Sequence, residues 1–215
     1  SLWLEAEALD GRLRSRLVYS GMNQGTDRFN DGVQQSNDYA TRRSLRYTGT
    51  YALDGLDARD SAQRLIFAAE SERETYRSSF APGGTYERDT HALALEYQGR
   101  IRKDIAVQAG LRHEFNDVFR DATSWNIAAA WQVPGQDLRL RAAVGRANVN
   151  PDMFQQFGWI PGVYEGNPDL RPERSLNYEL GADLGFASGR GQLSLTVFES
   201  KIKDMITGTA NSSVN

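Results

Sequence analysis

LNYELGADLGF, residues 176–186, alternates apolar and polar side chains without a break. The even positions carry the apolar set, Leu176, Tyr178, Leu180, Ala182, Leu184 and Phe186, and the odd positions carry Asn177, Glu179, Gly181, Asp183 and Gly185. Because successive side chains of a strand point to opposite faces, the stretch predicts a β-strand with one apolar and one polar face.

The same alternation recurs along the whole chain. It is clear at 104–112, 125–133 and 138–145, and weaker at about 2–9, 12–20, 42–53, 63–75, 87–98 and 191–203. The pattern predicts roughly ten strands, many of them about ten residues long. Strands of soluble proteins usually have about 5–6 residues, whereas a strand that crosses a membrane needs about 9–11.

The composition permits a membrane protein built from strands. The chain has 215 residues, a net charge of -3, 40% hydrophobic residues and a mean hydropathy of -0.58. No apolar run approaches the roughly 18 residues of a transmembrane helix. The low mean hydropathy suits a soluble protein, but a transmembrane β-barrel gives the same average because lipid-facing apolar residues alternate with polar lumen residues.

The sequence offers little for a catalytic or metal site built on cysteine or histidine. The chain has no Cys, which excludes disulfides, thiolate metal sites and a cysteine nucleophile. His91 and His113 are the only histidines and leave little for a metal site. There is no phosphate-binding glycine loop or serine nucleophile elbow, and the slightly acidic charge argues against nucleic-acid binding. We therefore expect neither an enzyme nor a nucleic-acid-binding protein.

The predicted connections between strands alternate between short and long. The short ones lie at 10–11, 54–62, 99–103, 134–136 and 188–191, and the long ones at 21–41, 76–86, 116–122, 148–174 and from 207 onward. Outer-membrane barrels have short periplasmic turns and longer extracellular loops. Aromatic residues also fall near the strand ends, with Tyr51, Tyr97, Trp131 and Phe186 on the short-turn side and Tyr19, Phe115 and Trp125 on the other. Two such groups are typical of aromatic girdles at the bilayer interfaces.

These features together favour an all-β fold, an antiparallel up-and-down transmembrane β-barrel. A soluble β-sandwich or barrel also alternates and has glycine-rich turns, and on alternation alone it is an equal alternative. Strand length, the order of the connections and the aromatic groups favour the membrane. Two rows of like charge on one strand face fit a wet lumen or rim better than a soluble core: Arg12, Arg14 and Arg16, and Glu70, Glu72 and Glu74.

A more specific motif lies in the last third of the chain. It reads GNPDLRPERS at residues 166–175 and continues with NYELG at 177–181. Together with its surroundings at 146–215, this motif resembles the corresponding stretch of TonB-dependent outer-membrane receptors, the transporters of ferric siderophores, cobalamin and related scarce nutrients. The remainder of the chain agrees with that family in pattern only.

The resemblance implies a barrel of about 22 strands closed around a plug domain. Residues 1–215 are then an internal part of that barrel, with roughly ten strands, and the plug, the TonB box and the closing strands are absent from the chain. The implied function is import of an iron–siderophore complex or a cobalamin-like chelate, with energy from the TonB–ExbB–ExbD complex. The implied location is the outer membrane of a Gram-negative bacterium, in contact with its lipid. A passive porin-like channel and a soluble β-rich binding module are the alternatives.

Two interpretations remain open for the aromatic residues of the segment 148–174, which are Phe154, Phe157, Trp159 and Tyr164. Extracellular aromatic rings stack on planar siderophore or corrin groups, but the same rings would equally pack the loop onto the barrel rim. For the motif that follows we favour a structural role, because its prolines stiffen an extended stretch and its charged residues offer strong hydrogen bonds. Its residues are Asn167, Pro168, Asp169, Leu170, Pro172 and Glu173.

A weaker hypothesis concerns Ca²⁺ binding at residues 26–38, TDRFNDGVQQSND. Asp27, Asp31 and Asp38 have offsets that resemble those of an EF-hand loop. Phe29 occupies a ligand position, however, and the last ligand is Asp rather than Glu. A hydrophilic surface loop is the preferred interpretation, and no other cofactor is expected.

Overall fold

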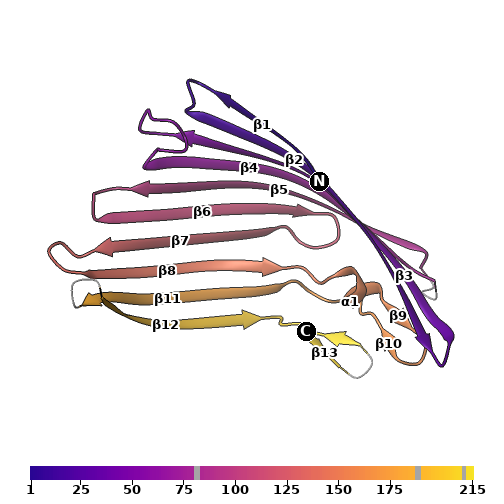
Figure 1. The fold of residues 1–215 in the computed structure, drawn as a ribbon. Coiled ribbons are helices and arrows are strands. Elements are labelled where there is room, and N and C mark those ends of the chain that lie inside the picture. The colour runs from indigo at the N-terminus through magenta and orange to yellow at the C-terminus, as the bar shows by residue number, and fades with distance from the viewer. Residues whose placement is uncertain (80–82, 187–189, 210–211) are drawn as a thin grey trace.

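The computed structural model describes residues 1–79, 83–186, 190–209 and 212–215. Ten strands form one antiparallel sheet in which each strand pairs with the next one of the sheet along the chain (Figure 1). They are β1 (Leu2–Ala8), β2 (Leu13–Asn30), β3 (Val33–Ala52), β4 (Gln63–Ser78), β5 (Thr85–Arg100), β6 (Ile105–Asn116), β7 (Ala122–Gln132), β8 (Leu138–Val149), β11 (Glu173–Phe186) and β12 (Gly191–Lys203). This order confirms the predicted up-and-down, all-β architecture.

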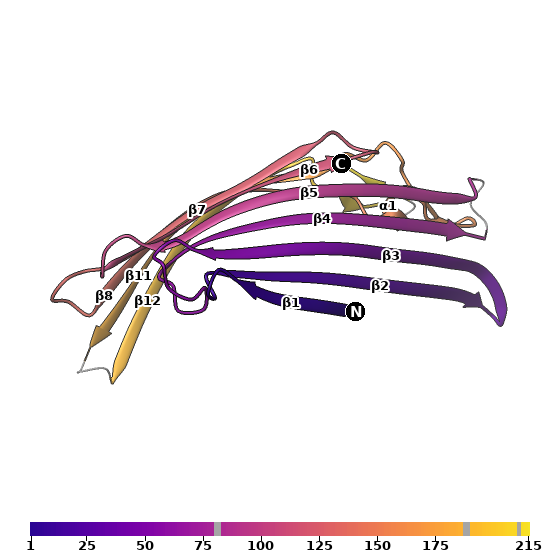
Figure 2. The same ribbon diagram turned by 90° about the horizontal axis from the view of Figure 1, so that it is seen from above.

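The sheet is strongly curved, with a convex and a concave face (Figure 2). Strands β1 and β12 lie at its two edges, so the sheet forms an arc of a barrel wall. Among the residues that the structure describes, no helix combines the length and the apolar composition that crossing a membrane requires.

The strand register places the apolar halves of all ten strands on the convex face. Leu180 on β11 lies opposite Ala142 on β8 and Val197 on β12, and Ala142 lies opposite Ala129 on β7. Rows of this kind continue across the sheet, and charged residues enter them only at the boundary away from the short turns, where Glu199 is opposite Tyr178 and Arg146 is opposite Trp125. We call the uncharged outward residues the uncharged band. It consists of the odd positions of 13–21, 45–51, 65–71, 93–99, 105–111, 125–131 and 191–197 and the even positions of 2–8, 138–144 and 176–186.

The uncharged band is open to the surroundings. Leu180 exposes 65% of its surface and Leu4 66%. Few apolar residues are buried in the described ranges, and half of them are alanines. They are Ala52, Ala58, Tyr76, Ala92, Met153 and Leu170. A soluble protein would cover such a large apolar surface with a second layer. The arrangement therefore fits a wall that faces lipid on its convex side, and it disagrees with the soluble alternative.

The aromatic groups lie as expected at the two ends of the uncharged band. Trp131 is opposite Ile105, and Phe186 is opposite Gly191, at the end with the short turns. At the other end Phe115 is opposite His91. The indole nitrogen of Trp131 donates to Asp104 Oδ2 at 2.9 Å, which gives the ring both an apolar surface and a polar partner, as at a membrane interface.

The prediction of a long loop at 21–41 is wrong. Strands β2 and β3 continue through this segment and meet at a two-residue turn, Asp31-Gly32. Both turn residues have positive φ, 49° and 77°, the combination that an Asp-Gly hairpin turn requires. The apolar alternation ends before this turn because the strands here rise beyond the uncharged band, so a pattern based on lipid-facing residues does not detect them.

The expected strict alternation of short and long connections is also wrong. The segment 117–121 is a five-residue turn, and the turn at 53–62 on the opposite side is longer than it. The expected turn at 188–191 and the middle of the expected loop at 76–86 include residues outside the described ranges. Within the described ranges the longest connection is that of β8 to β11, residues 150–172, and it contains α1 (Met153–Phe157), β9 (Trp159–Ile160) and β10 (Tyr164–Glu165).

Candidate functional site

Charged side chains on the concave face pair across neighbouring strands. Glu74 on β4 lies between Arg42 on β3 and Arg88 on β5, and each arginine donates its Nε–H to the Glu74 carboxylate at 2.9 Å. Only 6% of the Arg88 side chain and 12% of the Glu74 side chain are exposed. The two positive charges therefore compensate a carboxylate that is largely removed from water.

Further ion pairs extend this pattern along the wall. Glu70 binds Arg46 and Arg112, the latter at 2.6 Å, and these residues surround a cavity of about 270 Å³. Arg14 pairs with Glu5 at 3.0 Å near one edge of the sheet. The glutamates of the row Glu70, Glu72 and Glu74 thus pair with arginines of neighbouring strands. In the arginine row, Arg14 and Arg16 pair with Glu5, and Arg12 donates to the Tyr51 hydroxyl.

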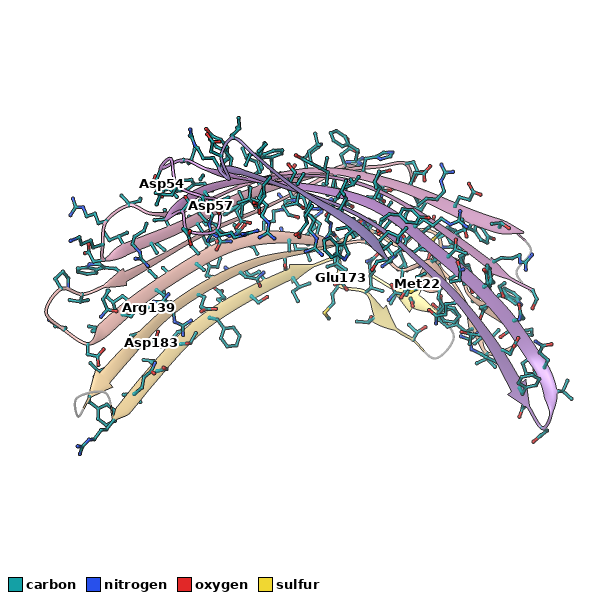
Figure 3. All side chains as sticks on the ribbon, turned by 45° about the horizontal axis from the view of Figure 1, so that its top comes forward. Met22, Asp54, Asp57, Arg139, Glu173 and Asp183 are labelled. Atoms are coloured by element: carbon teal, nitrogen blue, oxygen red, sulfur yellow. The ribbon has the colours of Figure 1, made fainter. Side chains whose placement is uncertain are left out.

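A similar cluster lies toward the short-turn end of β8 and β11. Asp183 is directly opposite Arg139 (Figure 3). Arg141 reaches Glu179 at 2.5 Å and Asp183 at 3.4 Å. The concave face is therefore a polar wall with closely balanced charge, suited to contact with water or with polar partners.

The long loop 150–172 packs against the concave face. Arg88 Nη1 donates to the Pro151 carbonyl at 2.8 Å, helix α1 contacts β4, and β9 contacts β3. Asp152 caps α1: its carboxylate accepts from the Gln155 N–H at 2.7 Å, and the Gln155 side chain accepts from the Asp152 N–H at 2.9 Å. This capping box fixes the start of a helix of only five residues.

Of the four aromatic residues of this loop, some pack against other rings and some line a cavity. Phe157 stacks on Tyr86 of β5, with ring centroids 4.0 Å apart. Phe154 stacks on Tyr164 at 4.8 Å and has the Arg28 guanidinium 5.0 Å from its ring centroid. Trp159 and Tyr164 both line a cavity of about 610 Å³. The structure therefore brings Phe154 and Tyr164 together and places Trp159 where a ligand has access.

The residues of the sequence motif lie between this loop and the end of the chain. Leu170 is buried, with 3% of its surface exposed. Asn167 donates to the Ser213 carbonyl at 3.1 Å, and Glu173 accepts from the Ile206 N–H at 2.6 Å. The Gln156 side chain donates to the Pro168 carbonyl at 3.5 Å. Asn167 and Pro168 also line the 610 Å³ cavity.

Two further motif residues have fewer contacts. The Asp169 N–H donates to Asn167 Oδ1 at 3.0 Å, and Pro172 leads directly into β11. Between them, Arg171 forms an ion pair with Asp204 at 3.2 Å and hydrogen bonds through its backbone to Asn215. These contacts tie the motif to residues 204–206 and 213–215, and its structural role stays a prediction.

The three aspartates of the calcium hypothesis do not converge. Asp27 accepts hydrogen bonds from Gln34 and Asn37, Asp38 pairs with Arg28 and accepts from Tyr76, and Asp31 lies in the hairpin turn. Within the described ranges no group of three or more metal-ligating side chains forms. Because 26–38 is a hairpin, the EF-hand offsets do not produce an EF-hand geometry.

Sequence alone does not identify Arg28, Tyr86 and Arg88 as partners of the loop. The alternation places Arg88 on a predicted strand, but its pairing with Glu74 depends on the register of β4 and β5. What the sequence does offer is the presence of arginines and glutamates at alternate positions of adjacent predicted strands, because such charges require partners.

Comparisons with known proteins agree with this geometry. The family model described as TonB dependent receptor-like, beta-barrel matches residues 3–215. An iron-regulated outer membrane virulence protein of Vibrio cholerae is 40% identical over 205 residues, which cover 89% of this chain and 30% of that protein. The vitamin B12 transporter BtuB of Photobacterium profundum is 32% identical over 140 residues, which cover 62% of this chain and 21% of that protein.

Solved structures share the fold at low sequence identity. The siderophore receptor PirA of Pseudomonas aeruginosa has a TM-score of 0.78 and 20% identity, over 98% of this chain and 40% of that structure. A mutant of the ferric enterobactin receptor PfeA of the same species has a TM-score of 0.72 and 19% identity, over 94% and 34%. The chain spans less than a third of the length of the two curated relatives. Since the family model covers almost all of the chain, this protein belongs to the TonB-dependent receptor family, within its β-barrel domain.

Proposed function

We propose that this chain is part of the wall of an outer-membrane active transporter that imports an iron–siderophore complex or a cobalamin-like chelate. The observation that carries the proposal is the two-sided sheet of a TonB-dependent receptor, with the uncharged band on its convex face and paired charges on its concave face. The convex face fits the lipid of the outer membrane of a Gram-negative bacterium. The concave face fits a lumen through which a polar chelate passes.

Three features support the substrate class. The relatives bear names that refer to iron regulation and to vitamin B12 transport. The loop 150–172 presents Trp159 and Tyr164 at an open cavity of about 610 Å³, which lies within the usual size of a small-molecule site. Aromatic rings at such a cavity suit planar chelating groups.

The energy source and its protein partners follow from the family. Active import by this family depends on the TonB–ExbB–ExbD complex, so we expect uptake to cease when TonB is absent. A passive porin-like channel, the alternative, would continue to conduct its substrate without TonB.

The complete gene should be tested in a Gram-negative strain without its own ferric-siderophore receptors. Growth under iron limitation is measured with a panel of ferric siderophores, and cobalamin-dependent growth is measured in parallel. We expect rescue by one compound or one chemical class, and no rescue in an otherwise identical strain that lacks TonB. Rescue that persists without TonB would establish a passive channel, and rescue by none of the chelates would contradict the proposed substrate class.

A further inference from the structure

The convex face changes from uncharged to charged at one level of the sheet. Arg43 on β3, Arg73 on β4 and Asp89 on β5 form one cross-strand row there. The adjacent row toward the short-turn end begins with Leu45 and Ser71, within the uncharged band. Arg43 and Arg73 therefore point outward at the upper boundary of the lipid-facing surface, on the side of the sheet that carries the loop 150–172.

The opposite boundary of the same strands has no comparable charges. The outward row near the short turns contains Tyr51, Leu65 and Tyr97. The long loop 150–172 and the parts of β2 and β3 that rise beyond the uncharged band lie on the side of these arginines, and outer-membrane barrels carry their longer loops on the extracellular side. The outward arginines thus lie at the level of the outer leaflet.

Arg43 and Arg73 are directly opposite each other, although like charges in such a pair repel. Arg73 is held by Asp89 through two parallel bonds, Nε to Oδ1 at 2.7 Å and Nη2 to Oδ2 at 2.5 Å, which leave its Nη1 donors available. Arg43 is exposed. Its side chain has neither an ion pair nor a hydrogen bond to the described part of the chain. Asp89 therefore compensates Arg73, whereas Arg43 has no carboxylate partner among the described residues.

Open space adjoins the unpartnered arginine. Gly21 on β2 is directly opposite Arg43, and a Cβ atom at Gly21 would meet no atom within 4 Å. On the side of Arg43 that faces β4, Asp89 keeps Arg73 in a fixed orientation. The backbone N–H of Asp89 donates to Asp117 Oδ1 at 3.0 Å. The result is one fixed and one free guanidinium on a part of the convex face that is open beside Gly21.

We propose that Arg43 and Arg73 bind a phosphate group of a phosphorylated lipid in the outer leaflet. Guanidinium groups match phosphate oxygens in charge and hydrogen-bond geometry. Basic residues at a membrane interface strengthen binding of anionic lipid headgroups. The acyl chains of the lipid lie against Leu45 and Phe67 of the uncharged band below. The inference rests on the outer-membrane location in the proposed function and is independent of the transported substrate.

The test uses the complete protein, purified in a neutral detergent and analysed by native mass spectrometry. The probe is hexa-acylated lipid A with both phosphates, compared with the same lipid after removal of its phosphates, and with inorganic phosphate as a competitor. The variants are Arg43→Gln, Arg43→Lys and, as a matched control, Arg102→Gln, which removes one exposed positive charge from the short turn at 101–104.

We expect Arg43→Gln to reduce lipid A adducts by about fivefold, Arg43→Lys to retain most of them and Arg102→Gln to leave them unchanged. Equal adducts with dephosphorylated lipid, or an equal loss in Arg102→Gln, would overturn the proposal. Full competition by millimolar inorganic phosphate would also overturn it, because the site would then recognise free phosphate. Failure of chelate uptake with normal lipid adducts would contradict only the proposed function.

Discussion

The rings of Tyr86 on β5 and Phe157 in helix α1 are stacked, with centroids 4.0 Å apart and planes 7° from parallel. This contact joins the loop 150–172 to the concave face of the sheet. A stacked aromatic pair contributes about 0.5–1.5 kcal/mol beyond its buried area. We expect Phe157→Ala to loosen the loop while the sheet stays folded, so that backbone amides of 150–172 in the complete protein exchange hydrogen faster.

Val163→Ala is the control for this loop variant, because Val163 lies in the same loop and exposes 57% of its surface. It should leave hydrogen exchange nearly unchanged. If Phe157→Ala also leaves exchange in the loop unchanged, Tyr86 and Phe157 do not anchor it.

The fold could be predicted from the sequence because lipid-facing and lumen-facing side chains alternate at a fixed period. Residues such as Leu180 and Leu184 report this period directly. The segment 21–41 could not be predicted in the same way, since its strands rise beyond the lipid and have no reason to alternate. The dipeptide Asp31-Gly32 predicts a hairpin turn only when strands flank it, and the polar residues on either side show no strand alternation.

The candidate site was predictable in residue type and not in arrangement. Aromatic composition indicated that Phe154, Phe157, Trp159 and Tyr164 make contacts, but it did not distinguish packing from open positions. That distinction depends on Tyr86 and Arg28, which approach the loop through the register and curvature of the sheet. Contacts between segments so distant in sequence carry no local signature.

Trp159 provides a test of ligand contact at the open cavity. Trp159→Ala removes an aromatic surface from its lining, and we expect the affinity for the chelate of the proposed function to fall by about 2–10-fold. Binding of the radiolabelled chelate to cells at low temperature measures this affinity apart from transport. Val118→Ala, a substitution in the turn 117–121 at the same end of the sheet as the loop 150–172, is the control. If Trp159→Ala binds the chelate as tightly as the unmodified protein does, Trp159 does not contact the ligand and the loop 150–172 has a packing role only.

The Arg42–Glu74–Arg88 cluster should contribute strongly to stability. Glu74→Gln leaves the Arg88 guanidinium, whose side chain is 6% exposed, without its carboxylate. Removing one partner of such a buried pair costs about 3 kcal/mol or more. Denaturant unfolding of the complete protein in detergent should show this loss. Glu7→Gln breaks an exposed pair with Arg59 of the turn 53–62 and should cost less than about 1 kcal/mol. Equal losses in the two variants would contradict the difference in burial.

The ring of Phe67 on β4 covers Gly49 on β3, on the convex face. A Cβ atom at Gly49 would lie 2.2 Å from Phe67 Cζ, so any larger residue must displace the ring. We expect Gly49→Val to cost about 1–3 kcal/mol of unfolding free energy in the native background. In a Phe67→Ala background the same substitution should cost clearly less. Equal costs in both backgrounds, measured as a double-mutant cycle, would show that the ring does not limit residue size at Gly49.

The turn at 53–62 should lose stability in acid through Asp54. Desolvation raises the pKa of the Asp54 carboxyl, but hydrogen bonds from Ser61 and from the N–H groups of Ala62 and Leu56 outweigh it, so the pKa lies below its ordinary value. The Ala62 bond is 2.8 Å long and the Leu56 bond 3.3 Å. A lowered folded-state pKa gives stability above the unfolded-state pKa of about 3.9, and that stability is lost as the pH falls through the folded-state value.

The melting temperature of Asp54→Asn should therefore lie below that of the unmodified protein at pH 7, and the difference should close as the pH falls below the unfolded-state pKa of about 3.9 and through the lower folded-state value. Thermal unfolding in detergent at several pH values measures it. Asp60→Asn removes a carboxylate from the same turn that accepts no hydrogen bond in the described ranges, and its effect should stay small and nearly independent of pH. A difference for Asp54→Asn that stays constant from pH 7 to pH 3 would mean that the variant acts through side-chain shape, since loss of a charge-assisted hydrogen bond must follow protonation of the carboxylate.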